Sequence, residues 1–425
     1  MSTATAMRWA SCLSERTDLD AALAECRARI AGRLGDAPPD VLFVFATPHF
    51  QPQYERLAGR LQEAFAPRRL FGGSALGLVG DGRELEDAGG LSVTAARLPG
   101  VELSTFHVTQ ELLPNEDASP RAWEQLAGAD PRTEPDFVLL VDPFTLRADE
   151  LVRGLDFAFP RASKVGGLVS GARQRGQNVL FIDGHVERAG AIGLVLRGAA
   201  RLDPLVAQGC RPIGAPLRVT QCKDNSLQAV DGRKPLEVVA ALFEAAGERD
   251  RQLIRSALFL GLIGDPFKNE PPQAGDFLIR NILGMDPQQG ALVVGALLRE
   301  GQTVQFHVRD AQAADEDLQA VLRRYASALL NEGRGQALAA PPAGALLFSC
   351  LGRGRHMYGH ADHDTGAFKR HLGDVPLAGF FCNGEIGPVG GTTYVHGFTS
   401  CFGVFRAKSE PLAAPPPPPP AAPEA

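Results

Sequence analysis

The stretch Val41-Leu-Phe-Val-Phe-Ala46, together with the glycine element Phe71-Gly-Gly-Ser-Ala-Leu-Gly77, decides the fold. The first segment is a short continuous apolar run, which is typical of a buried strand. An amphipathic helix pattern lies between this run and the glycines, so the segment predicts a strand–helix–strand unit of about 30 residues. We expect the G-x-x-x-x-G spacing to mark a tight turn where two backbones approach closely.

The same pattern returns further along the chain. An apolar run at residues 137–141 starts 96 residues after the first run, and the glycines of residues 166–171 follow the first ones by 94 residues. A diverged third copy combines a strand at residues 345–350 with a glycine element at residues 378–384. These copies predict an α/β, mixed α+β fold of duplicated strand–helix–strand units with mixed sheets.

The organisation along the chain predicts two fused domains. We expect an N-terminal helix within residues 1–35, the duplicated domain over residues 36–200 and a second domain over residues 201–408. Residues 409–425 contain six consecutive prolines and predict a disordered, Pro-rich tail.

Composition limits the class of protein. The chain has 425 residues with 43 Lys and Arg against 49 Asp and Glu, a net charge of −6, which argues against a nucleic-acid partner. We find no apolar run that approaches the ~20 residues needed to span a bilayer, and no secretory signal, so we expect no membrane partner. The seven cysteines form no C-x-x-C pair, which favours a reduced, cytoplasmic protein.

Several motifs resemble those of the FIST N and FIST C domain family. The first is the element Phe71-Gly-Gly-Ser-Ala-Leu-Gly77, which is similar to the FIST N domain. The others are similar to the FIST C domain: Asp276-Phe-Leu-Ile-Arg-Asn281, Gly301-Gln-Thr-Val-Gln-Phe-His-Val-Arg-Asp310, Phe348-Ser-Cys-Leu-Gly-Arg353 and Gly379-Phe-Phe-Cys-Asn-Gly-Glu-Ile-Gly-Pro-Val-Gly390. The resemblance implies a FIST N-like domain over residues 36–200 and a FIST C-like domain over residues 201–408.

The resemblance also implies a function. It points to a sensory, signal-transduction protein that binds a small ligand, such as an amino-acid-like molecule. Some bacterial relatives are associated with haem and nitric-oxide sensing next to histidine kinases. We see no kinase segment here, so we expect the output to pass through a separate signalling protein such as a histidine kinase.

Arg280, Arg309 and Arg353 each follow an apolar strand. A guanidinium at a strand end can hold a carboxylate through two hydrogen bonds. The alternative is a structural ion pair, for example with Glu385 or Asp310.

The third glycine element places Asn383, Gly384 and Glu385 in its turn. Glu385 is suited to accept the amino group of an amino-acid-like ligand, and its alternative role is to stabilise the turn. Since strand ends at one edge of an α/β sheet favour ligand sites, we expect Arg353 and Glu385 to lie in one pocket.

Cys350 ends the third strand, three residues before Arg353, and a nearby cation favours a thiolate. With His396 as a base, this thiol would suit a cysteine-dependent acyl-transfer enzyme. The alternative is that Cys350 is a small buried hydrophobic residue.

Four of the nine histidines fall between His356 and His371. His356, His360 and His363 have spacings that would suit a zinc or haem site, whereas a surface loop is the plainer reading. We therefore predict a cytoplasmic, non-enzymatic small-ligand sensor without a cofactor. The alternatives are a haem-based gas sensor, the Cys350/His396 enzyme, and a scaffold that binds partners through the proline tail.

Overall fold

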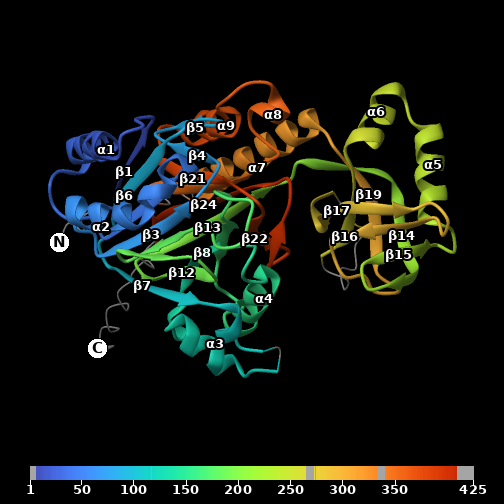
Figure 1. The fold of residues 1–425 in the computed structure, drawn as a ribbon, viewed down its shortest axis with the longest axis horizontal. Coiled ribbons are helices and arrows are strands. Elements are labelled where there is room, and N and C mark those ends of the chain that lie inside the picture. The colour runs from blue at the N-terminus through green and yellow to red at the C-terminus, as the bar shows by residue number, and fades with distance from the viewer. Residues whose placement is uncertain (1–5, 116, 265–271, 273, 333–339, 409–425) are drawn as a thin grey trace, which may run out of the picture.

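The computed structural model describes residues 6–115, 117–264, 272, 274–332 and 340–408. Within these residues, the chain forms three six-stranded sheets and one closed barrel. The sheets share one body, and the barrel stands beside it as a separate lobe (Figure 1). The expected mixed α and β fold with two domains is confirmed.

Each sheet is built on one unit with a common order: strand, helix, strand, helix, parallel strand, hairpin and final strand. The first unit consists of β1 (Arg8–Ser14), α1 (Leu19–Leu34), β2 (Val41–Ala46), α2 (Tyr54–Phe65), β3 (Arg69–Ser74), β4 (Gly77–Gly80), β5 (Arg83–Leu85) and β6 (Leu91–Arg97). The second consists of β7 (Val101–Val108), α3 (Pro120–Ala127), β8 (Asp136–Val141), α4 (Ala148–Ala158), β9 (Lys164–Leu168), β10 (Leu180–Ile182), β11 (His185–Glu187) and β12 (Ala191–Gly198). The predicted duplication therefore holds for these elements and their order.

The third unit follows the same order with the barrel inserted after its first strand. It consists of β13 (Ala200–Ala207), α7 (Ala311–Glu332), β20 (Gly344–Cys350), α8 (Arg355–Tyr358), α9 (His363–Leu372), β21 (Leu377–Cys382), β22 (Glu385–Val389), β23 (Thr392–His396) and β24 (Ser400–Ala407). Short 3-10 turns lie at η1 (Pro48–Gln53), η2 (Gln110–Leu112), η3 (Pro131–Thr133) and η4 (Ala274–Asp276).

The units exchange their hairpins in a cycle. The β4–β5 hairpin of the first unit pairs with β21 of the third, β10–β11 of the second pairs with β3, and β22–β23 of the third pairs with β9. Each sheet is thus completed by another unit, which gives the body a pseudo-threefold arrangement. Residues far apart in the sequence meet at these exchanged hairpins.

The first glycine of each element explains why the motif repeats. A Cβ at Gly72, Gly166 or Gly379 would lie 1.7, 1.9 or 1.8 Å from the carbonyl oxygen of the adjacent parallel strand. No side chain fits at that distance, so glycine is required for the two strands to approach. The close backbone approach expected from the sequence is confirmed.

The barrel closes around its own core. Its strands are β14 (Cys210–Lys223), β15 (Ser226–Val230), β16 (Leu258–Ile263), β17 (Phe277–Asp286), β18 (Ala291–Val294) and β19 (Thr303–Arg309), in the order β14-β15-β18-β17-β16-β19. Two helices, α5 (Pro235–Ala245) and α6 (Glu248–Ser256), lie between β15 and β16.

The largest core of the body lies where the sheets face one another. The rings of Phe45 and Phe380, from the first and third units, are 4.8 Å apart, as are those of Trp9 and Phe405. Each such side chain contributes roughly 1.5–3 kcal/mol by burial, so these contacts bind the units into one body.

The N-terminal segment contains a strand in addition to the predicted helix. Within residues 1–35, a strand, β1, precedes the expected helix and pairs with β6, so the sequence missed this strand. The boundary predicted at residue 200 coincides with the start of β13. The predicted tail, residues 409–425, lies outside the described residues.

Candidate functional site

Polar side chains in the third unit stand where the other two units carry apolar ones. The register pairs one residue at the end of the central strand with one at the start of the final strand in every unit. These pairs are Ala46 with Leu91, Val141 with Ala191, and Ser349 with Ser400. The third unit has therefore replaced two apolar side chains by hydroxyls at the same place in the fold.

The third unit also has a charged residue, Glu385, where the other two units have a leucine. Leu78, Leu180 and Glu385 occupy equivalent positions in the three exchanged hairpins, as their strand pairing shows. Both leucines lie in the central core, and Glu385 is equally buried at 0% exposure. Burying a carboxylate is unfavourable compared with burying a leucine, so packing alone does not account for Glu385.

Arg353 and Asp364 form the centre of this polar region. The guanidinium donates from Nε to Oδ2 at 2.9 Å and from Nη2 to Oδ1 at 3.0 Å. Asp364 also accepts hydrogen bonds from Ser349 Oγ at 3.0 Å and from Ser400 Oγ. Burial opposes ionisation of Asp364, but the charge of Arg353 and these donors hold the pKa of its carboxyl well below its usual range.

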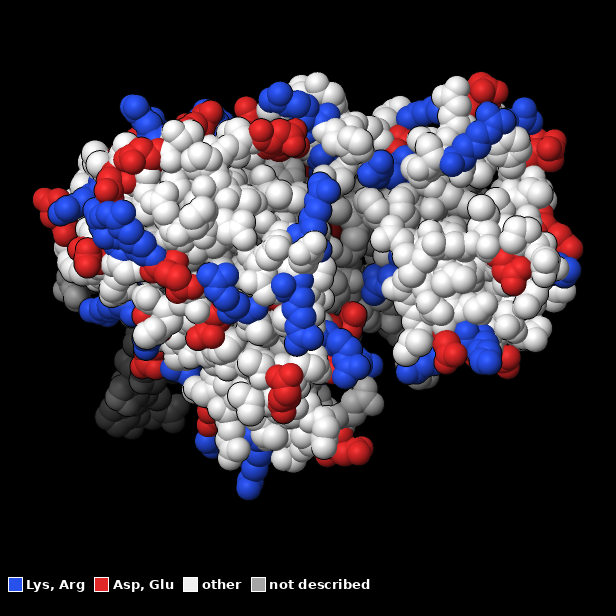
Figure 2. Space-filling view, in the orientation of Figure 1, with Lys and Arg blue, Asp and Glu red and all other residues white. Residues whose placement is uncertain are grey.

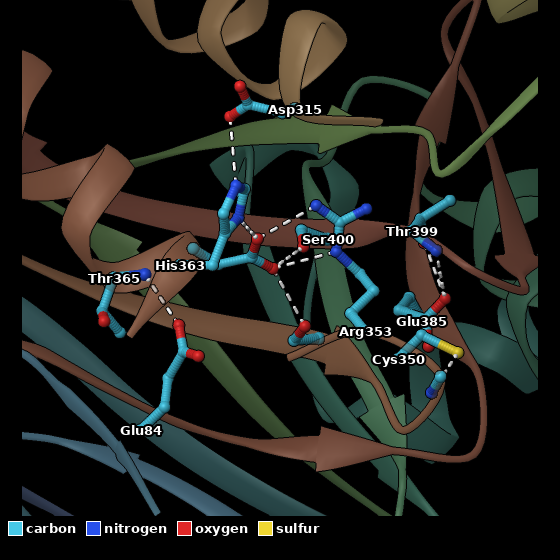
Figure 3. A network of polar contacts seen from close by, with 12 residues as sticks. Glu84, Asp315, Cys350, Arg353, His363, Thr365, Glu385, Thr399 and Ser400 are labelled. Carbon is cyan, nitrogen blue, oxygen red and sulfur yellow. Dashed lines mark hydrogen bonds and ion pairs between the residues drawn. The ribbon is translucent and has the colours of Figure 1, made fainter. Parts of the chain in front are cut away.

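Two more titratable groups adjoin the pair. His363 bonds Asp364 Oδ1 through Nδ1 at 3.0 Å and Asp315 Oδ1 through Nε2 at 3.1 Å. Glu84, from the exchanged β4–β5 hairpin, accepts a hydrogen bond from the Thr365 amide at 2.9 Å. Burial, and next the charge of Asp364, raise the pKa of Glu84 to about 8. We call the set Glu84, Ser349, Arg353, His363, Asp364 and Ser400 the central polar cluster; Figure 3 shows its contacts.

Glu385 lies on the opposite side of Arg353 from Glu84 (Figure 3). Its Oε2 accepts hydrogen bonds from the Thr399 amide at 3.1 Å and from Thr399 Oγ1 at 2.7 Å. Burial raises the pKa of Glu385 to about 7. Arg353 and Glu385 are thus neighbours, but each is fully buried, and Arg353 forms its ion pair with Asp364. The structure brings the predicted pair together in the protein interior.

Cys350 and His396 do not form a nucleophile–base pair. His396 Nε2 bonds the Gly387 carbonyl at 2.9 Å, and burial lowers the pKa of its imidazole to about 4. Burial, and next the charge of Glu385, raise the pKa of the Cys350 thiol to about 12. The geometry and the pKa values both oppose a thiolate mechanism.

The other residues predicted to bind a ligand lie outside the central polar cluster, and they differ in how deeply they are buried. Arg280 Nη1 donates to the carbonyls of Ile279 and Val395, each at 3.1 Å, while Arg309 lies over the Phe398 ring at 5.5 Å. Asn383 is exposed, and its amide donates to the Val169 carbonyl at 3.3 Å. Gly384 is buried, and its carbonyl accepts from the Leu168 amide at 2.8 Å. Asn383 and Gly384 therefore join the second unit to the third.

The rings of His360 and His363 lie 5.6 Å apart, but the three predicted histidines do not converge on one point. His360 Nδ1 contacts the Ala361 carbonyl at 2.9 Å, and His356 is exposed, whereas both nitrogens of His363 contact carboxylates. Among the described residues, no group of three or more His, Cys, Asp or Glu is placed to hold a metal ion.

An open cavity adjoins the central polar cluster. It has a volume of about 660 Å³ and lies between the first and third units, at the ends of β2 and β20. Its polar lining comprises Thr47, His49, Glu86, Asp87, Arg173, Arg355 and His356, and its apolar lining includes Leu351 and Phe381. We call it the boundary cavity. Leu351 and Arg355 flank Arg353 in the sequence, so the cavity wall and the buried cluster share one segment.

Most contacts of the central polar cluster and the boundary cavity could not be predicted from the sequence. Asp364 sits beside the histidines in the sequence, but nothing there pairs it with Arg353. Glu84 and Glu86 reach the third unit only through the exchanged hairpin, which no local pattern reveals. The available signal for the cavity was Arg355, which follows Arg353 by two residues.

Family models match most of the chain: the FIST N domain over residues 40–233 and the FIST C domain over residues 235–388. An uncharacterized protein of Mycobacterium tuberculosis, Rv0628c, is 36% identical over 395 residues, which cover 92% of this chain and 98% of that protein. The uncharacterized protein Mb0898c of Mycobacterium bovis is 41% identical over 268 residues, covering 63% of this chain and 67% of that protein.

A solved structure, a cyanuric acid hydrolase from A. caulinodans, aligns with 95% of this chain and 100% of its own at 10% identity and a TM-score of 0.35. That score is too low to bear on the chemistry of this chain. None of the helices in the described residues is long and apolar enough to cross a membrane.

Proposed function

Because the chain belongs to the FIST N and FIST C domain family, whose domains are associated with sensory signal transduction, we propose that it is a small-ligand sensor that binds its ligand in the boundary cavity. The observation that carries the proposal is the position of the cavity. It opens at the ends of strands, where α/β sheets favour ligands, and it adjoins polar residues present in the third unit alone among the three.

The size of the cavity suits a metabolite. A volume of about 660 Å³ lies within the range of small-molecule sites, roughly 300–1,000 Å³. Leu351 and Phe381 offer apolar surface for a ligand side chain or carbon skeleton. The cavity is therefore large enough for an amino acid but too small for a folded partner.

The charges lining the cavity favour an amino-acid-like ligand. Arg173 and Arg355 can bind a carboxylate, while Glu86 and Asp87 can bind an ammonium group. Glu86 is already held in place, because its carboxylate accepts the Arg355 amide at 2.9 and 3.1 Å. Opposite charges on one cavity complement a zwitterion better than a simple anion or cation.

We further propose that the protein acts in the cytoplasm through a separate signalling protein such as a histidine kinase. Ligand binding would be reported through the segment that carries Leu351, Arg353 and Arg355. This segment joins the cavity wall to the buried Arg353–Asp364 pair, so a shift of the wall reaches the core of the third unit.

The test is a thermal-shift screen of the twenty amino acids and small carboxylates against the full chain. A ligand at a hundredfold excess over its Kd stabilises the folded state by about 2.7 kcal/mol. Arg355→Gln and Glu86→Gln should each weaken the response, whereas Arg121→Gln, on an exposed position of α3, should leave it unchanged. If no compound shifts the melting temperature, or if the cavity variants respond like the parent chain, the proposal is wrong.

A further inference from the structure

The barrel is joined to the third unit by two connections that meet. The chain leaves the unit through Gly209, between β13 and β14, and returns through Asp310, between β19 and α7. The Asp310 amide lies 3.5 Å from the Gly209 carbonyl. Phe398, in the turn before β24, contacts the barrel here, with its ring 4.3 Å from that of Phe259.

Two guanidinium groups lie at this junction without enough acceptors. Arg353 uses Nε and Nη2 to bind Asp364, but its buried Nη1 has no hydrogen-bond partner, although the side chain is 0% exposed. In the described part of the chain, Arg309 has no carboxylate within 4.0 Å and no side-chain hydrogen bond. The adjacent Asp310 binds Arg211 and Arg249 instead, each at 2.8 Å.

The backbone around these groups is kept free of side chains. A Cβ at Gly352 would lie 3.0 Å from Arg309 Nη1, and one at Gly209 would lie 3.3 Å from Arg353 Nη1. Phe398 adopts a φ of 62°, which is unfavourable for a bulky residue and often accompanies a functional site. Arg309 therefore lies over the Phe398 ring, and Arg353 Nη1 lies beside Gly209, close to the Phe398 carbonyl.

The surface of the body beside the junction carries positive charge. Figure 2 shows basic side chains gathered along the side of the body that faces the barrel, while acidic and basic groups are mixed elsewhere on this face. Arg309, which has no carboxylate partner among the described residues, and the free Nη1 of Arg353 attract an anion more strongly here than at an exposed position, because the surrounding dielectric is lower.

We propose that Arg309 and Arg353 Nη1 bind a small oxyanion at the junction between the barrel and the third unit. The ligand is a carboxylate or an inorganic oxyanion, because the Arg309 guanidinium can bind two oxygens and Arg353 Nη1 can donate to one of them. This site is separate from the boundary cavity and goes beyond the sensory function proposed above. Its occupant would neutralise Arg309, accept a hydrogen bond from Arg353 Nη1 and hold the Phe398 turn against the barrel connections.

The experiment measures the melting temperature of the full chain in sodium acetate, nitrate and sulfate, against sodium chloride at the same ionic strength. We expect a saturable rise with oxyanion concentration in the parent chain. Arg309→Gln should weaken the apparent affinity at least tenfold, whereas Arg299→Gln, an exposed arginine of the same barrel, should not change it. If only acetate raises the melting temperature, the site is specific for a carboxylate. If acetate, nitrate and sulfate all raise it, the site accepts oxyanions in general.

Gly352→Ala provides a second variant that retains both charges but places a methyl group beside Arg309. It should also weaken the response, and circular dichroism establishes that each variant is folded. The proposal is overturned if the melting temperature follows ionic strength alone, or if Arg309→Gln and Gly352→Ala respond like the parent chain. Since Arg309 does not line the boundary cavity, a failure here leaves the amino-acid response of the cavity intact, and the two proposals fail separately.

Discussion

Glu385 of the third unit and Leu180 of the second occupy the same position in their sheets. Each lies opposite the residue that follows the close-approach glycine, Gly167 for Glu385 and Gly73 for Leu180. The fold thus accepts either side chain at a fully buried position. A carboxylate retained there, where a leucine fits, must be stabilised by local donors, and Thr399 supplies them.

Glu385 should make stability depend on pH. Its folded-state pKa is about 7, against about 4.3 for an unfolded glutamate, so the folded chain keeps a proton that the unfolded chain releases. Stability therefore falls as the pH rises from about 4.3 to 7, by up to about 3.7 kcal/mol. Glu385→Gln should remove this part of the slope, measured by urea unfolding at several pH values.

Two comparisons make that measurement specific. Glu84, with a pKa of about 8, keeps its own contribution in the variant, so some slope should remain. Glu63→Gln, at a side chain that is 76% exposed, should reproduce the parent profile. A Glu385→Gln profile as steep as that of the parent chain would show that Glu385 titrates normally.

Asp364 should be essential for folding because of Arg353. Asp364→Asn leaves the Arg353 charge buried without its counter-ion, which costs about 3–5 kcal/mol. Asp315→Asn, at a side chain that is 43% exposed, should cost less than about 1 kcal/mol. The double variant Arg353→Met with Asp364→Leu should recover part of the loss, since it buries no charge. Equal stability of Asp364→Asn and the parent in urea would contradict the pairing.

The repeat was predictable from the sequence because it depends on local features. Buried strands and glycine spacings are periodic, so the elements around Gly72 and Gly166 could be matched directly. The equivalence of Leu180 and Glu385 was not predictable, because Leu180 follows Gly171 by nine residues whereas Glu385 directly follows Gly384. Extra loop residues in the second unit cause this difference, and only strand pairing reveals it.

The site was less predictable, since its contacts are not local. Arg353 was identified as a strand-end cation, but its partner Asp364 is selected by how α9 packs on the sheet. Glu84 is distant in sequence and arrives through hairpin exchange. Patterns along a chain identify residue types suited to a site, whereas the burial that changes their chemistry arises from the assembled units.

The close-approach glycines should tolerate no side chain. Gly166→Ala would place a Cβ 1.9 Å from the Leu139 carbonyl oxygen, so β8 and β9 would have to separate. We expect a loss of more than about 3 kcal/mol or failure to fold, beyond the usual range for a single substitution. Gly59→Ala, in α2 with nothing within 4 Å, should instead stabilise the chain by up to about 1 kcal/mol. Similar melting temperatures for the two variants would refute the steric explanation.

Cys350 should resist alkylation in the folded protein. With a pKa of about 12, roughly one thiol in ten thousand is ionised at pH 8, and the thiolate is the reactive form. Cys222 is partly exposed on the barrel and should react with iodoacetamide first, which mass spectrometry of digested protein can map. Cys222→Ser should remove the early product, and Cys350 should react only after unfolding in urea. Labelling of Cys350 as fast as that of Cys222 would mean that its thiol is activated, and it would restore the cysteine-dependent enzyme as an explanation of this site.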